Sequence, residues 1–184
     1  MSSNPNERKF KPLNIAVMTV SDTRTEATDK SGDTLVKLLT GAGHRLAEKR
    51  IVPDDLYRIR AVISQWIADA NINAVITTGG TGITARDSTP EAVSVLFDKQ
   101  IDGFGEVFRA VSYEEINTST IQSRAVAGVA NATFIFCLPG STGACRTGWG
   151  KLISHQLDYR TRPCNLVELM PRVTSSPDEL FTPE

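Results

Sequence analysis

The sequence predicts an α/β protein with a buried, parallel sheet and helices on both of its faces. Short apolar runs alternate along the chain with segments whose apolar residues repeat every three to four positions. The runs 13–20, 74–78 and 132–138 are rich in Val, Ile and Phe, as is typical of strands buried on both faces. Strands that alternate with helices favour parallel pairing, with the helices covering the sheet.

In the first half of the chain, an N-cap residue, Ser31, and a helix-ending residue, Gly43, bound the first expected helix. A weaker strand is expected over 45–52. Pro53-Asp54-Asp55 then begins a second helix, because the apolar residues between Leu56 and Ile67 fall on one face.

In the second half, Thr89-Pro90-Glu91 begins a helix, since proline is well tolerated at the first helical position. Residues 104–111 and 121–130 are also expected to be helical, and a final helix carries Trp149 to Leu157 after the strand 132–138. The helix at 104–111 carries more apolar surface than one sheet layer needs. We therefore expect a symmetric homo-oligomer, with the excess contributed by Phe104, Val107 and Phe108.

Length and composition indicate a single domain. The 184 residues are 40% hydrophobic and 22% charged, with a net charge of −1. That balance excludes a disordered chain and offers no basic surface for nucleic acid. No apolar run approaches the roughly 18 residues of a membrane span. We expect a flexible arm at 1–12, one domain at 13–173 and a flexible tail at 174–184.

The cysteines indicate a reducing compartment. Cys137, Cys145 and Cys164 are odd in number and form no C-x-x-C pair, and the segment Met1–Lys11 is polar, unlike a secretory signal. We therefore expect reduced thiols in a cytoplasmic protein. Neither histidine lies near a cysteine in the sequence, so no zinc site is predicted.

Three polar segments follow strands of the predicted sheet: Ser21-Asp22, the loop after Thr78 and the loop after Leu138. Ligands of parallel α/β sheets bind beyond the carboxyl ends of the strands, so these segments predict one shared site. Ser21, Asp22, Pro139 and Gly140 are expected to line its pocket. For Ser21 and Asp22 the alternative is an ordinary polar strand end.

The strongest single motif is the loop Thr78-Gly79-Gly80-Thr81-Gly82. Glycines permit positive φ and close approach of a ligand, and successive N–H groups form a nest for anions. We expect these amides, with the hydroxyls of Thr78 and Thr81, to bind phosphate. A tight turn without a ligand is the alternative.

Two other phosphate loops fit less well. A P-loop needs a lysine that is missing after this loop. The G-x-G-x-x-A match of Gly80, Gly82 and Ala85 follows about the third strand, whereas a dinucleotide fingerprint occupies the first βα turn. An NAD-dependent oxidoreductase is therefore disfavoured.

Asp87 stands five positions after Gly82. A carboxylate beside bound phosphate requires a cation, and Mg²⁺ binds through one or two carboxylates together with substrate phosphates. The alternative is a turn or helix-cap role. Ser88 and Glu91 form a capping-box pattern of their own, which argues against that alternative.

Four stretches together carry a family resemblance: VMTVSDTR (17–24), RIVPDD (50–55), VITTGGTG (75–82) followed by Asp87, and CLPGSTGAC (137–145). With TSTIQSRAVAGVAN (118–131), they resemble the MoaB/MogA family of molybdenum cofactor biosynthesis proteins over about residues 13 to 170.

The resemblance implies a three-layer α/β/α sandwich with a mostly parallel sheet, assembled as a homotrimer or homohexamer. It implies an enzyme that binds molybdopterin and adenylylates it with Mg-ATP, giving AMP-molybdopterin and pyrophosphate. Asp54 and Asp87 match the family's acids and are expected to be catalytic and to hold Mg²⁺. Ser141 is expected to contact the molybdopterin phosphate. For Asp54, the alternative is a helix N-cap.

One departure keeps a second function open. Adenylylating relatives usually carry P-G-N-P after the last long strand, whereas this chain has Pro139-Gly140-Ser141-Thr142. The alternative is a non-catalytic protein of the same pathway that binds molybdopterin or a nucleotide.

Overall fold

Six strands form one mixed sheet in the order β2-β1-β3-β6-β5-β4. The computed structural model describes residues 8–171. Neighbouring strands are parallel from β2 through β1 and β3 to β6, and β5 is antiparallel to both β6 and β4. The strands are β1 (Asn14–Val20), β2 (Arg45–Val52), β3 (Ala74–Thr78), β4 (Lys99–Gln100), β5 (Val126–Ala130) and β6 (Thr133–Leu138).

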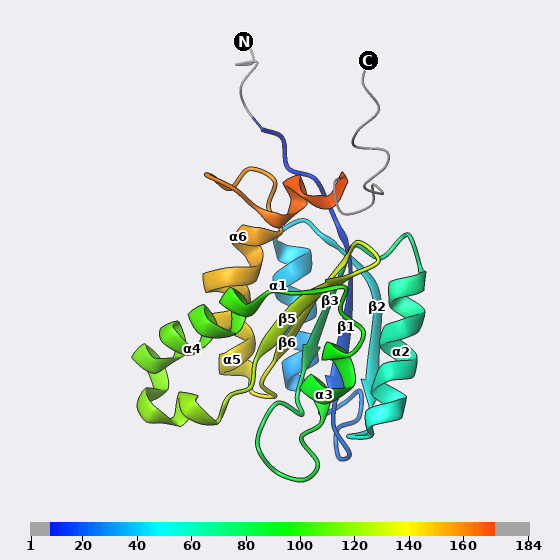
Figure 1. Cartoon of the computed structure of the whole chain (residues 1–184), viewed down its shortest axis with the longest axis vertical. Coiled ribbons are helices and arrows are strands. Elements are labelled where there is room, and N and C mark those ends of the chain that lie inside the picture. The colour runs from blue at the N-terminus through cyan, green and yellow to red at the C-terminus, as the bar shows by residue number, and fades with distance from the viewer. Residues whose placement is uncertain (1–7, 172–184) are drawn as a thin grey trace.

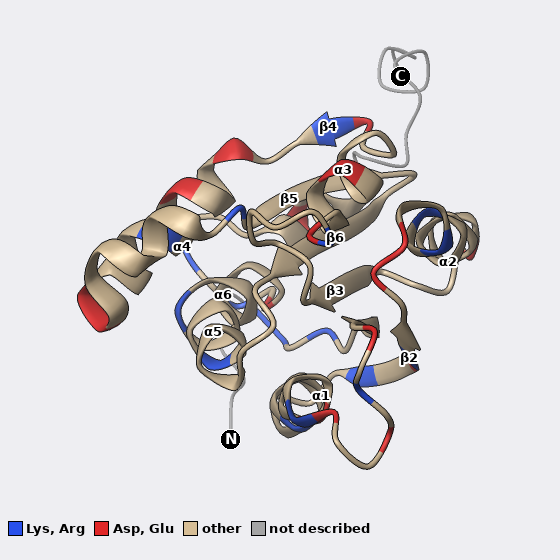
Figure 2. Ribbon diagram, turned by 90° about the horizontal axis from the view of Figure 1, so that it is seen from below, with Lys and Arg blue, Asp and Glu red and all other residues tan. Residues whose placement is uncertain are grey.

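Helices cover both faces of the sheet, so the predicted three-layer, mostly parallel α/β sandwich is confirmed (Figures 1 and 2). One face carries α2 (Leu56–Ala68) and α3 (Thr89–Ser94). The other carries α1 (Lys30–Gly41), α4 (Asp102–Ile116), α5 (Thr142–Thr147), the π-helical turn η2 (Gly148–Ile153) and α6 (Ser154–Gln156). Two short 3₁₀ helices are η1 (Asn117–Gln122) and η3 (Leu166–Glu168).

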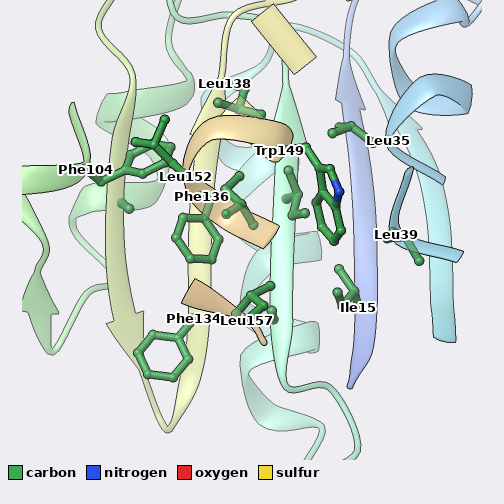
Figure 3. Close-up of a cluster of buried hydrophobic side chains, with 14 of the residues drawn as sticks. Ile15, Leu35, Leu39, Phe104, Phe134, Phe136, Leu138, Trp149, Leu152 and Leu157 are labelled. Carbon is green, nitrogen blue, oxygen red and sulfur yellow. The ribbon is translucent and has the colours of Figure 1, made fainter. Parts of the chain in front are cut away.

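Successive residues of each central strand point to opposite faces of the sheet and pack into two separate hydrophobic cores. Ile15 and Val17 face a core shared with α1, α4 and η2, part of which Figure 3 shows. Ala16 and Met18 face the opposite core, formed with α2 and α3. This alternation is the period-2 geometry of a strand buried on both faces.

The large side chains of the helices mostly serve these cores. Trp66 and Trp149 are buried. Phe104 and Phe108 are also buried against the sheet, so their expected role as surplus surface for an oligomer is wrong. Val107, between them on α4, is 49% exposed.

The expected helix over 121–130 is wrong. Only its first residues lie in η1, and Val126–Ala130 forms β5, which pairs with β6. The hairpin between them turns through Asn131 and Ala132, both with positive φ. Pairing with β6 satisfies the backbone hydrogen-bonding groups of β5. In this strand Gly128 packs directly against the Phe97 ring, where a Cβ would not fit. Tertiary pairing here overrides local propensity.

Two helix starts also differ from expectation. The N-cap of α1 is Asp29, whose carboxylate accepts from the Gly32 amide at 2.9 Å, and Ser31 lies inside the helix. At α3, Ser88 occupies the N-cap position without a side-chain capping bond, so the expected capping box does not form. Its partner Glu91 is instead paired with Arg124.

Residues 8–12 of the expected arm contact the domain. Phe10 packs on the His44 ring at 5.0 Å between centroids, and Lys11 lies 3.9 Å from the centre of the Tyr159 ring. The rest of the arm, 1–7, and the expected tail, 174–184, fall outside the described residues. Among residues 8–171, we find no helix with the length and apolar character needed to cross a membrane.

Candidate functional site

The sheet order places four strand ends side by side. Because β2, β1, β3 and β6 are neighbours and parallel, the loops that follow them meet at one edge of the sheet. Figure 2 looks toward this edge and shows acidic residues in the connection entering α2. The three segments expected to form one site therefore do lie together: Ser21-Asp22, Thr78–Gly82 and Pro139–Ser141. Asp54, which follows β2, lies at the same edge.

The first two residues of the glycine loop are held by the protein itself. Gly79 has φ +106°, and its amide donates to the Leu138 carbonyl at 3.0 Å. The Thr78 hydroxyl is buried and donates to the Pro139 carbonyl at 3.0 Å. These two donors tie the β3 loop to the β6 loop, so they are not available to bind phosphate as expected.

The next residues of the loop are better placed for a ligand. Within residues 8–171, no acceptor takes the amide hydrogens of Gly80 or Thr81. Gly80 has φ +65°, and a Cβ there would lie 3.3 Å from an Asp54 carboxylate oxygen. The loop therefore presents free amides directly beside an acid.

Asp54 and Asp22 form a reciprocal pair across the ends of β2 and β1. Asp54 Oδ2 accepts from the Asp22 amide at 3.0 Å, and Asp22 Oδ1 accepts from the Asp54 amide at 3.1 Å. Arg86 donates to Asp22 Oδ2 from Nε at 3.0 Å and from Nη2 at 2.6 Å. These bonds from Arg86 lower the pKa of Asp22, whereas burial and the neighbouring Asp22 charge raise the pKa of Asp54.

The alternative role of Asp54 as a helix cap is wrong. The N-cap of α2 is the next residue, Asp55, which accepts from the amides of Tyr57 at 3.1 Å and Arg58 at 2.9 Å. The Asp54 carboxylate is therefore turned to the sheet edge rather than to the helix.

Asp87 lies on the other side of the glycine loop. Its Oδ2 accepts from the Thr84 amide at 2.9 Å and from the Thr84 hydroxyl at 2.6 Å. The hydroxyl bond is the main cause of a lowered pKa for Asp87, so the carboxylate is charged at neutral pH. A Cβ on Gly82 would lie 2.7 Å from the same oxygen, so the glycine lets acid and loop meet.

Ser21 and Ser141 have local roles at the edge. Ser21 Oγ accepts from the amides of Thr23 and Arg24, both at 3.2 Å, which closes a turn. Ser141 is the N-cap of α5, and its Oγ accepts from the Ala144 amide at 3.0 Å. The Ser141 hydroxyl hydrogen is still available as a donor to a ligand, whereas Ser21 Oγ also lies 3.5 Å from the Thr23 hydroxyl.

Arg124 was not predicted as a site residue, yet it fixes the glycine loop. Its side chain donates to the carbonyls of Gly82 at 2.6 Å and Asp87 at 2.7 Å and pairs with Glu91. Its own amide donates to the Thr81 carbonyl at 3.0 Å. Arg124 lies within the stretch 118–131 that contributes to the family resemblance, but the local sequence does not reveal its role, because its partners lie more than thirty positions earlier in the chain.

A pocket of about 360 Å³ opens between the two glycine loops, η1 and α4. Five predicted site residues line it: Thr81, Gly82, Pro139, Gly140 and Ser141. Asp22, Asp54 and Asp87 do not, although Gly82 joins the pocket to Asp87. The walls also contain a contact that the sequence did not reveal: Glu115 of α4 accepts from the Thr147 hydroxyl of α5.

Two of the cysteine thiols, Cys137 and Cys145, are buried and unreactive. Burial raises the pKa of Cys137 to about 12 and that of Cys145 to about 11, so neither thiol is a nucleophile at neutral pH. Across residues 8–171, no three His, Cys, Asp or Glu side chains gather as a metal site.

Comparison with known proteins identifies the family. Residues 16–159 match the family model described as "Probable molybdopterin binding domain". The chain belongs to this molybdopterin-binding family. It is 55% identical over 157 residues to molybdenum cofactor biosynthesis protein B of Escherichia coli K12, which covers 85% of this chain and 92% of that one. The family resemblance deduced from the motifs is thus confirmed.

Solved structures agree with the family assignment. A crystal structure of molybdenum cofactor biosynthesis protein B superposes with a TM-score of 0.78 at 43% identity, covering 91% of this chain and 96% of that one. The tungsten cofactor synthesizing protein MoaB from Pyrococcus furiosus gives 0.74 at 35% identity, covering 90% and 99%. The chain is therefore a molybdenum cofactor biosynthesis protein with the fold of its family.

Proposed function

We propose that this protein binds molybdopterin and transfers AMP to it from Mg-ATP, releasing pyrophosphate. The observation that carries the proposal is the shared sheet edge. There a pocket, a loop with two free amides and the Asp22–Asp54 pair adjoin one another. The family model and the curated relatives support molybdopterin as one substrate.

The proposed reaction needs no covalent bond between the protein and its substrates. The terminal phosphate oxygen of molybdopterin attacks the α-phosphorus of ATP, and the bond from that phosphorus to the β-phosphate oxygen breaks. The protein must align two polyanions and offset their charge. The amides of Gly80 and Thr81 bind phosphate oxygens. Arg86, whose side chain is 63% exposed, offsets the negative charge of the same phosphates from the outer side of the site.

The donor set at the edge suits the magnesium ion that accompanies ATP. Asp22 and Asp54 are hard oxygen ligands placed together. Burial and the Asp22 charge raise the pKa of Asp54, so a bound cation would stabilise its charged form. Bound with the nucleotide, Mg²⁺ would neutralise charge that develops on the phosphates. Asp54 fits this role better than Asp87, whose Oδ2 already accepts two bonds from Thr84. It also fits better than Asp22, whose Oδ2 already accepts two bonds from Arg86.

The direct test is to incubate the purified protein with molybdopterin, ATP and Mg²⁺ and to measure AMP-molybdopterin and pyrophosphate. Asp54→Asn should lower the initial rate about a hundredfold, as expected for loss of a group that stabilises transition-state charge. Glu106→Gln removes one charge from the exposed side of α4 and should leave the rate unchanged. A wild-type protein that binds molybdopterin and forms no AMP-molybdopterin would establish the non-catalytic alternative instead.

We also propose that the protein assembles as a homotrimer or as a pair of trimers. Three apolar side chains on α4 and η1 are exposed: Val107 at 49%, Ile116 at 50% and Ile121 at 76%. Burial against another subunit would remove their apolar surface from water. Sedimentation equilibrium at micromolar concentration should give three or six times the 20.0 kDa chain mass, and a monomer would contradict the proposal.

A further inference from the structure

The pocket between the glycine loops has an unusual charge. Among the described residues that line it, Glu115 is the one charged side chain. Its other polar groups are hydroxyls, one amide side chain and backbone, and its apolar walls include Phe108, Ile116 and Pro139. A pocket with a single negative charge and no cation does not favour a phosphate group.

Thr147 fixes the direction of the Glu115 carboxylate. Its hydroxyl lies 3.0 Å from Oε1 and 2.8 Å from Oε2, and it has a single hydrogen to donate. Two carboxylate oxygens together accept about four hydrogen bonds, so most of the acceptor capacity of Glu115 is unused by Thr147. Thr147 is buried, which anchors this contact in the pocket wall.

A carboxylate of this kind binds best to two parallel N–H donors on a planar group. A pterin offers that pair on its pyrimidinone ring, at the 2-amino group and the adjacent ring N–H. We propose that Glu115 recognises this donor edge and thereby selects a pterin, with Thr147 as its positioning residue. The inference rests on the proposed function, because it assigns one end of molybdopterin to this pocket.

The rest of the pocket agrees with this orientation. Phe108, Ile116 and Pro139 supply apolar surface for the faces of a flat heterocycle, and a volume of about 360 Å³ is within the range of small-molecule sites. With the pterin at Glu115, the phosphate end extends past Thr81 and Gly82 toward the free amides and Asp54. The reacting phosphate is then placed at the edge where the carboxylates lie.

Two stable probes test the inference without ATP: 6-hydroxymethylpterin and 6-hydroxymethyllumazine, which carries a carbonyl in place of the 2-amino group. Fluorescence titration should show that wild type binds the pterin at least tenfold more tightly. Glu115→Gln should weaken pterin binding about tenfold to a hundredfold, as expected for lost charged hydrogen bonds. The preference over lumazine should vanish, since a glutamine amide can donate to the carbonyl.

Two further variants separate recognition from folding. Glu114→Gln removes the neighbouring charge on α4 outside the pocket and should keep the wild-type preference. Thr147→Val should reduce the preference partially while circular dichroism stays native, because the carboxylate loses its anchor. An unchanged preference in Glu115→Gln, or no pterin binding by wild type, overturns the inference.

The same titrations distinguish this inference from the proposed function. If Glu115→Gln instead tightens binding of inorganic pyrophosphate and leaves pterin binding unchanged, the pocket holds the phosphate end and the inference is wrong. If the pterin preference behaves as expected and wild type forms no AMP-molybdopterin, adenylyl transfer fails and the inference stands.

Discussion

Replacing Gly79 with alanine should destabilise the protein, whereas the matched change Gly41→Ala should not. A Cβ at Gly79 would lie 2.2 Å from the Val20 carbonyl oxygen, which is a backbone atom at the end of β1. Neither partner can rotate away, because the Gly79 amide is bonded to Leu138 and β1 pairs with β3 up to Thr78. Relief of this contact therefore requires the backbone of the two strands to move apart.

The magnitude follows from two costs. Overpacking of a rigid site costs about 1–3 kcal/mol. A side chain at φ +106° adds about 1–2 kcal/mol of backbone strain. Together we expect about 3 kcal/mol of lost stability, which lowers the thermal midpoint by roughly 6–12 °C for a domain of this size.

The matched control is Gly41→Ala. Gly41 is the last residue of α1, and a Cβ there meets nothing within 4 Å. Alanine is the better helix former, so this variant should gain about 0.5 kcal/mol. Urea and thermal unfolding of both variants measure the two effects. Equal stability of the two variants would refute the packing described for the sheet edge.

Three other predictions test the site and the packing of the domain. Arg124→Gln should lower the free energy of unfolding by about 1–3 kcal/mol, because the carbonyls of Gly82 and Asp87 lose charged donors. Amide hydrogen exchange at residues 81–88 should accelerate in this variant and not in the exposed-surface control Arg146→Gln. Equal protection of these amides in the two variants would contradict the prediction. Asp54→Asn should raise the thermal midpoint at pH 7 while adenylyl transfer falls, because a carboxylate with a raised pKa is destabilising when charged; a lower midpoint would show that the charge is structural. Burial lowers the pKa of His44, whose Nδ1 accepts from the Leu13 amide at 3.2 Å. As the pH falls below about 6.5, the unfolded chain takes up the proton first, so the stability advantage of wild type over His44→Gln should shrink between pH 7.5 and pH 5; a constant difference in urea midpoint would contradict this.

The layered architecture and the location of the site could both be predicted from the sequence pattern alone. Unbroken apolar runs such as 13–20 and 74–78 can be satisfied only by burial on both faces, which requires helices above and below a parallel sheet. Parallel strands place their carboxyl ends together, so the polar residues after them had to share one edge. The positive φ angles of Gly79 and Gly80 could also be predicted, because consecutive glycines permit this backbone conformation without strain.

The tertiary structure decided which groups at that edge remain available to a ligand. Local sequence could not tell that Asp55 rather than Asp54 caps α2, or that the donors of Thr78 and Gly79 are used by the β6 loop. Nor could it predict β5, whose residues 126–130 form a strand because β6 lies beside them.

The pocket wall is the clearest case. Glu115 and Thr147 stand 32 positions apart, on helices whose spacing is set by how each packs against the sheet. Arg124 reaches the glycine loop because β5 is antiparallel to β6, so the start of β5 lies beside the end of β6 at that edge. Such contacts depend on distances between elements, and the sequence pattern within one element carries no information about them.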